Sequence, residues 1–177
     1  KSFFEFVENP TGAHYRTILD NLAATPEYRP YAGYIEQIQG LLDSEDYEKA
    51  YEACQRSKAT LLLSPELHML AGYAAREMGD DELFNLERVI TSACVRGILD
   101  TGDGTKDEPY VVSVTGDEYF ILEVLKKTFE SQELVEDGDR YMDLIKTTDG
   151  TEIYFDITKP YQNLQKQLFE KSDDTDE

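Results

Sequence analysis

The spacing of apolar residues along this chain changes once, in the loop between Asp100 and Pro109. Before the loop, apolar side chains recur every three or four positions, which is typical of helices with one buried face. After it, short β-branched runs alternate apolar and polar residues, as strands do. The sequence therefore predicts an α+β fold with a helical subdomain (residues 1–100), an α+β subdomain (101–171) and an acidic tail (172–177).

Five helices are expected in the first subdomain, after an apolar arm from Phe3 to Val7 that ends in a turn. The first helix ends near Pro26, and Pro30 is expected to start the second. Ser64, with Pro65 directly after it, is typical of a helix start. The hydrophobic content of the chain, 40%, is enough for a core.

Two similar segments in the helical part stand 34 positions apart, at Asp46–Ala50 and Asp80–Phe84. This is the period of tetratricopeptide repeats, which present a concave face to partner proteins. Phe84 stands where the repeat normally has a small residue, so we expect one repeat and the first helix of another. The candidate partner-binding residues are Tyr47, Glu48, Tyr51, Asp80 and Asp81.

The second subdomain is expected to contain a small antiparallel sheet and two helices. A buried strand is predicted at 110–114, followed by a helix that Gly116 and Asp117 begin. Asp149-Gly150 between two strand-like runs predicts a two-residue hairpin turn. Pro160 begins a terminal helix.

Four short motifs mark the C-terminal half. They are Gly102-Asp103-Gly104-Thr105, the strand from Tyr110, Asp117-Glu118-Tyr119, and a strand that includes Tyr154-Phe155-Asp156. Together, over roughly residues 43–169, they resemble a bacterial family catalogued as domain of unknown function 4919. The resemblance implies an architecture and no activity.

The charge balance is strongly acidic, with 17 basic and 37 acidic residues and a net charge of −20. Such a field repels phosphate backbones and anionic lipids, so nucleic-acid and membrane binding are disfavoured and basic proteins are favoured as partners. No apolar run approaches the roughly 18 residues of a membrane span. We expect a cytoplasmic location, and the oligomeric state stays open.

Few residues are suited to catalysis. Only His14 and His68 could act as a histidine base, and we interpret both as structural.

Other reactive motifs are also incomplete. Cys54 and Cys94 stand apart without metal-binding spacing, so buried free thiols are favoured over a disulfide. Gly97 and Gly102 match half of a phosphate-binding loop, but Asp103 replaces its lysine. No cofactor is expected.

Two acidic groups remain as alternatives. Asp100, Asp103, Asp107 and Glu108 could supply oxygen ligands to Ca²⁺ or Mg²⁺, although a solvated turn is favoured. Tyr154 and Asp156 with Glu118 form the best carboxylate–tyrosine group, for which packing is favoured over acid–base chemistry.

The sequence thus supports three classes of function. The leading hypothesis is a non-catalytic interaction module that binds a basic protein, in a sharper form an antitoxin or immunity protein that neutralises a cationic toxin. The second is a metal-assisted hydrolase that uses the loop 100–108. The third is a structural module of a larger assembly, in which the arm from Phe3 to Val7 contacts another subunit.

Overall fold

The computed structural model describes residues 2–173, with side chains to residue 169. The predicted acidic tail lies mostly outside this range, because 172 and 173 end the last helix and 174–177 are outside the described residues. The helices before the first strand are α1 (Phe3–Glu8), α2 (Gly12–Ala23), α3 (Tyr34–Asp43), α4 (Tyr47–Leu61), α5 (Pro65–Glu77) and α6 (Asp81–Leu99). After them come β1 (Tyr110–Val111), α7 (Gly116–Val124), β2 (Phe129–Asp137), β3 (Arg140–Thr147), β4 (Glu152–Asp156) and α8 (Thr158–Asp173).

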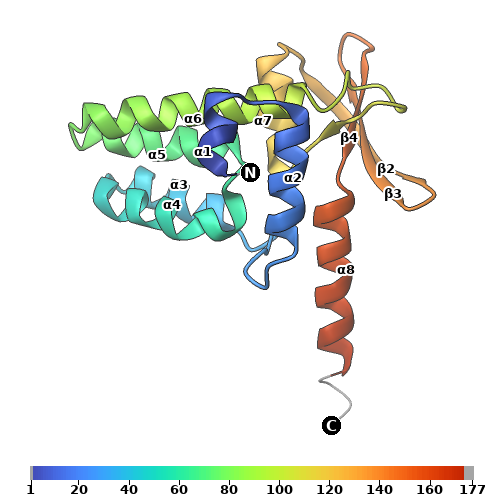
Figure 1. Ribbon diagram of the computed structural model, residues 1–177, viewed down its shortest axis with the longest axis horizontal. Coiled ribbons are helices and arrows are strands. Elements are labelled where there is room, and N and C mark those ends of the chain that lie inside the picture. The colour runs from blue at the N-terminus through green and yellow to red at the C-terminus, as the bar shows by residue number, and fades with distance from the viewer. Residues whose placement is uncertain (1, 174–177) are drawn as a thin grey trace.

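The fold is α+β, as predicted, and the helical half stands beside the sheet. In Figure 1, α3 to α6 lie together on one side, the sheet lies on the other, and α2 stands between them. α8 leaves the sheet and runs alongside α2.

Local signals explain both boundaries of α5. The hydroxyl of Ser64 accepts a hydrogen bond from the backbone N–H of Leu67 at 3.4 Å, and Pro65 occupies the first turn of α5. Gly79, just past that helix, has a φ of 78°, which an L side chain rarely adopts. The start of α5 therefore follows the prediction, and Gly79 explains its end.

Two helix starts differ from the prediction. The arm from Phe3 to Val7 is helix α1, because Ser2 and Glu5 form a reciprocal capping box and Phe6 is fully buried. The helix expected to start at Pro30 begins at Tyr34 instead, after Gly33 in a left-handed conformation.

The sheet has four strands in the order β1-β4-β3-β2. β2, β3 and β4 pair antiparallel, as expected, but β1 pairs parallel to β4, with Tyr110 opposite Phe155. The sheet is therefore mixed. No local sequence pattern specifies this parallel pairing, because α7, β2 and β3 separate β1 from β4 in the sequence.

The turn between β3 and β4 is longer than the predicted two residues. Thr147 and Thr151 are joined by a backbone hydrogen bond of 3.0 Å, and Gly150 before Thr151 has a φ of 82°. This matches a three-residue loop in which glycine takes the left-handed position. The turn stands where Asp149-Gly150 predicted it, with a different length.

The core joins the two predicted subdomains. One buried cluster contains Phe6, Tyr15 and Ile98 from the helical half together with Ile145 and Phe155 from the sheet. A second cluster lies among α3, α4 and α5 and contains Cys54. Cys94 belongs to the first cluster, and both cysteines are free and buried.

Among residues 2–173, none of the helices combines the length with the apolar character that a membrane span requires.

Candidate functional site

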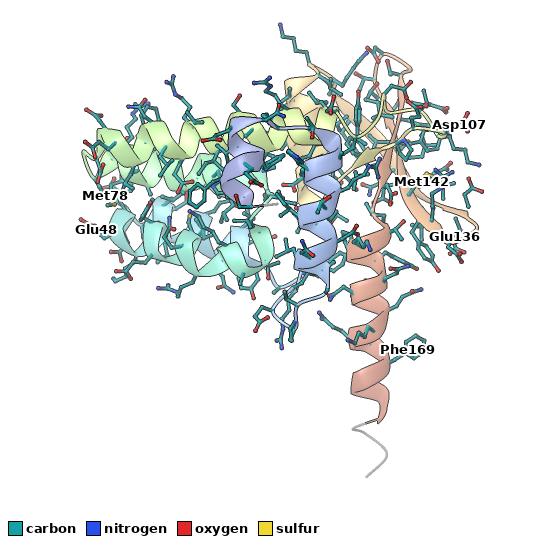
Figure 2. All side chains as sticks on the ribbon, in the orientation of Figure 1. Glu48, Met78, Asp107, Glu136, Met142 and Phe169 are labelled. Atoms are coloured by element: carbon teal, nitrogen blue, oxygen red, sulfur yellow. The ribbon has the colours of Figure 1, made fainter. Side chains whose placement is uncertain are left out.

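The predicted partner-binding residues lie at the outer end of the helical half. Figure 2 shows Glu48 there, beside Met78 and far from the sheet. The ring of Tyr47 meets that of Tyr73 edge-on, with centroids 6.2 Å apart. Tyr51 is half-buried, and burial, followed by the charges of Glu87 and Asp80, raises the pKa of its hydroxyl.

The two aspartates of this group have different surroundings. Asp80 is the N-cap of α6 and accepts a hydrogen bond from the backbone N–H of Leu83 at 2.9 Å. Asp81 and Glu48 are exposed in the first turns of α6 and α4. Carboxylates and half-exposed tyrosines therefore share this end, which we call the helical acidic face (Tyr47, Glu48, Tyr51, Asp80 and Asp81).

A buried ionic network lies deeper among the same helices. The Glu87 side chain has no exposed surface and accepts hydrogen bonds from Lys58, at 3.0 Å, and from Nδ1 of His68. The other ring nitrogen of His68 lies 2.9 Å from the carbonyl oxygen of Leu62. Both ring nitrogens therefore have a partner, and these two contacts fix the orientation of the ring.

The network stabilises the charged form of Glu87. Burial acts to raise the pKa of this carboxyl, but the hydrogen bonds and charges of His68 and Lys58 outweigh burial and lower it. His68 thus has the satisfied packing role that the sequence favoured. Glu87 belongs to none of the predicted sites, although its position between Leu83 and Ile90 places a charge on the apolar stripe of α6.

The acidic loop 100–109 is held by its own hydrogen bonds. The carboxylate of Asp100 accepts from the backbone N–H of Gly12 at 2.7 Å. That of Asp103 accepts from the backbone and the hydroxyl of Thr105, and these bonds lower its pKa. A side chain at Gly104 would meet the ring of Tyr110 at 2.7 Å, so this glycine serves close packing.

The four predicted metal-ligand residues, Asp100, Asp103, Asp107 and Glu108, line one open hollow of about 520 Å³. Asp156 also lines it, so the loop and the last strand do meet. Arg16 and Arg140 share the hollow, however, and their positive charges would repel a cation. Nowhere in residues 2–169 do three or more His, Cys, Asp or Glu side chains form a group that could hold a metal ion.

Asp117 of the Asp117-Glu118-Tyr119 motif was expected at the start of a helix. It does lie in the first turn of α7, but its side chain is buried. Its carboxyl accepts hydrogen bonds from the hydroxyls of Ser64, at 2.6 Å, and Ser113, at 3.2 Å. Burial raises the pKa of Asp117 to about 8 against the opposing effect of these two bonds. The group is therefore mainly protonated near neutral pH. It ties α5 to α7 inside the molecule and has no exposed surface.

Glu118 pairs with Asp143, a residue that belongs to none of the predicted sites. Burial, followed by the charge of Asp143, raises the pKa of Glu118 well above its usual range, and burial raises that of Asp143 too. Gln132 of β2 donates to Glu118 at 3.4 Å and accepts from the hydroxyl of Tyr119 at 2.8 Å. A proton on one of the two carboxyls allows them to lie together.

The structure does not bring together Tyr154, Asp156 and Glu118, the group for which packing was favoured over acid–base chemistry. Asp143 pairs with Phe155, so its side chain lies on the face of the sheet opposite to those of Tyr154 and Asp156. Glu118 contacts Asp143, so its side chain lies on the same face as Asp143 and away from Tyr154 and Asp156. Asp156 accepts from the backbone N–H of Thr158 at 2.9 Å and helps to start α8.

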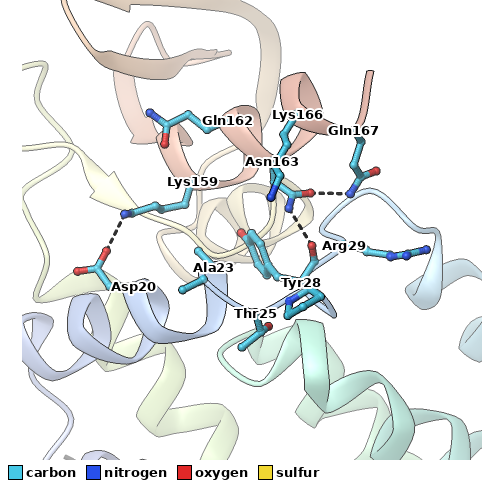
Figure 3. A pocket seen from close by; sticks show the side chains of 12 residues that line it. Asp20, Ala23, Thr25, Tyr28, Arg29, Lys159, Gln162, Asn163, Lys166 and Gln167 are labelled. Carbon is cyan, nitrogen blue, oxygen red and sulfur yellow. Dashed lines mark hydrogen bonds and ion pairs between the residues drawn. The ribbon is translucent and has the colours of Figure 1, made fainter. Parts of the chain in front are cut away.

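A second hollow, of about 730 Å³, lies between the end of α2 and α8 (Figure 3). Arg29, Lys159 and Lys166 line it, in contrast to the acidity of the whole chain. Lys159 is paired with Asp20 at 2.8 Å, and Asn163 donates to the carbonyl oxygen of Tyr28 at 2.9 Å. These contacts hold α8 against the rest of the fold.

The sequence motifs agree with the comparison against family models. The chain matches the model described as a domain of unknown function (DUF4919) over residues 20–166. It belongs to this family. The match begins inside α2, so the DUF4919 region extends further upstream than the motifs indicated. No curated protein and no solved structure matches the chain.

Proposed function

We propose that this protein is a non-catalytic interaction module that binds a basic protein partner through its acidic surface. The observation that carries the proposal is the helical acidic face, where carboxylates and half-exposed tyrosines lie together at the outer end of α4 and α6. Tyrosine supplies contact area at low entropic cost, and carboxylates select for positive charge.

The distribution of buried carboxyls supports a binding role over catalysis. Asp117 and Glu87 have no exposed surface and accept hydrogen bonds from Ser64 and His68. Glu118 is also buried and lies against Asp143, although its Oε1 atom has no hydrogen-bond partner among the described residues. The sharper form of the proposal, an antitoxin or immunity protein, rests on the same charge and on the small size of the domain.

The test compares two variants with the same change in net charge. The first replaces Glu48→Gln, Asp80→Asn and Asp81→Asn, and asparagine at position 80 preserves an N-cap. The control replaces Glu8→Gln, Asp107→Asn and Glu123→Gln, which are exposed at other places. Binding of a panel of purified basic proteins is measured at low salt and at about 0.5 M salt.

We expect at least one basic protein to bind the parent chain and to be released at high salt. The first variant should then bind about tenfold more weakly, and the control should change little. Equal weakening in both variants would mean that net charge alone acts, and binding that salt does not change would contradict the proposal.

A further inference from the structure

β2 is the free edge of the sheet. It is nine residues long, its only neighbour in the strand order is β3, and eight of its nine residues are exposed. Within residues 2–173, its backbone makes no hydrogen bond to a segment other than β3. Alternate N–H and C=O groups of an edge strand point away from the sheet and remain open to another chain. In Figure 1 the β2–β3 hairpin projects away from the helices.

This edge carries acidic charge without internal compensation. Glu130, Glu133 and Glu136 are exposed, and no described Lys or Arg forms an ion pair with any of them. Asp137 is the exception, since it pairs with Arg140 at 2.9 Å. β2 itself contains no basic residue. Self-association by this edge would place these glutamates near those of the second copy, which is unfavourable.

Apolar side chains accompany the charges. Leu134 is 44% exposed and Phe129 is 41% exposed, and the Phe129 ring lies against that of Tyr119 at 5.5 Å. Gln132 is fixed between Tyr119 and Glu118, so the strand is anchored from behind. An exposed strand with apolar residues and one sign of charge offers both the contact area and the selectivity that strand addition requires.

We propose that an extended, lysine- or arginine-rich segment of the partner adds to the sheet along β2. The inference rests on the proposed function for the basic character of the partner, and it adds a second contact surface. Figure 2 places Glu136 at the end of the molecule opposite to Glu48, so the two surfaces are separate. Backbone hydrogen bonds supply affinity, and cross-strand pairs with the glutamates supply selectivity.

The experiment uses the full chain and an end-capped peptide that spans the length of β2, with lysine at every third position and valine or threonine between, so that successive lysines lie on opposite faces as Glu133 and Glu136 do. A second peptide has the same sequence with N-methyl groups on all its central residues, which keeps the charge and removes the backbone donors. Affinity is measured by fluorescence anisotropy, and hydrogen exchange of the β2 amides is measured with and without peptide. We expect the first peptide to bind about tenfold more tightly than the methylated one and to protect alternate β2 amides.

Two variants identify the surface. The first carries Glu130→Gln, Glu133→Gln and Glu136→Gln, and the second is the helical triple variant described above, with the same change in net charge. The inference requires the β2 variant to lose affinity for the peptide and the helical variant to keep it. If only the helical variant loses affinity, strand addition is overturned and the proposed function stands. Equal binding of the methylated peptide, no binding of either peptide, or a β2-linked dimer in light scattering would each overturn it.

Discussion

Asp117 illustrates how a surface-type residue becomes part of a core. Its carboxyl is buried between the hydroxyls of Ser64 and Ser113, and it keeps a proton near neutral pH because ionisation would leave a charge without a counter-ion. The sequence placed it at a helix start, where aspartate normally faces water. The difference comes from tertiary structure, because Ser64 lies 53 positions away in the sequence, whereas Ser113 is a near neighbour.

This burial predicts a pH dependence of stability. The pKa of Asp117 is about 8 in the folded protein against an ordinary 3.8, so the folded state keeps a proton that the unfolded state releases between these values. The contribution to stability is full below the ordinary pKa and decreases as pH rises toward 8. Each pKa unit corresponds to about 1.4 kcal/mol.

The variant Asp117→Asn mimics the protonated form, so its free energy of unfolding should fall less between pH 5 and about 8 than that of the parent. Urea unfolding over this range measures both. Asp139→Asn, at an exposed position, serves as the control and should follow the parent curve. Parallel curves for Asp117→Asn and the parent would show that Asp117 is ionised in the fold.

Glu87 gives a second prediction at the residue scale. Replacement by glutamine leaves Lys58 and the ring of His68 without their anionic partner inside the helical half. Loss of one member of a buried ionic network costs about 3 kcal/mol. Glu82→Gln on the exposed side of α6 should cost less than about 0.5 kcal/mol. Chemical unfolding compares the two, and equal values would mean that the network adds no stability.

At the scale of elements, local patterns predicted more than pairing patterns did. The helices α2, α5 and α6 follow apolar periodicity and capping residues, which act over a few positions, whereas α3 starts later than its proline predicted. The parallel pairing of β1 with β4 joins residues far apart in sequence, such as Tyr110 and Phe155, and no local signal specifies it. The same reason explains why Asp143 was missed, because its role appears only when Glu118 lies over the sheet.

The N-terminal helix α1 provides a test at this scale. Phe6 is fully buried against Gly97 and Tyr15, whereas Phe4 on the same helix is 78% exposed. Phe6→Ala should therefore destabilise the fold by about 3–5 kcal/mol, and Phe4→Ala should change stability little. Thermal unfolding measures both. The interpretation of this segment as an arm for another subunit predicts the reverse, with Phe4→Ala altering the oligomeric state in light scattering.

At the scale of the whole molecule, the net charge of −20 opposes compaction, because like charges are closer in the folded than in the unfolded chain. The ion pairs of the described residues are mostly exposed, so they recover little of this cost. An acidic surface is thus maintained against a stability cost. A basic partner that neutralised it would stabilise the domain on binding.

Self-repulsion predicts that added salt stabilises the free protein. Screening by about 0.15 M NaCl reduces the range of the repulsion to roughly 8 Å, and each kcal/mol recovered raises Tm by about 2–4 °C for a chain of this size. The rise should be gradual for NaCl and KCl alike, since no particular ion is required.

CaCl₂ and MgCl₂ should also raise Tm gradually, because Arg16 and Arg140 line the acidic hollow at Asp103. A rise in Tm that saturates at a low, near-stoichiometric concentration of either divalent ion would instead reveal a specific metal site in that hollow. Replacement of Asp103 and Asp107 by asparagine would then abolish the saturating part and leave the gradual part unchanged.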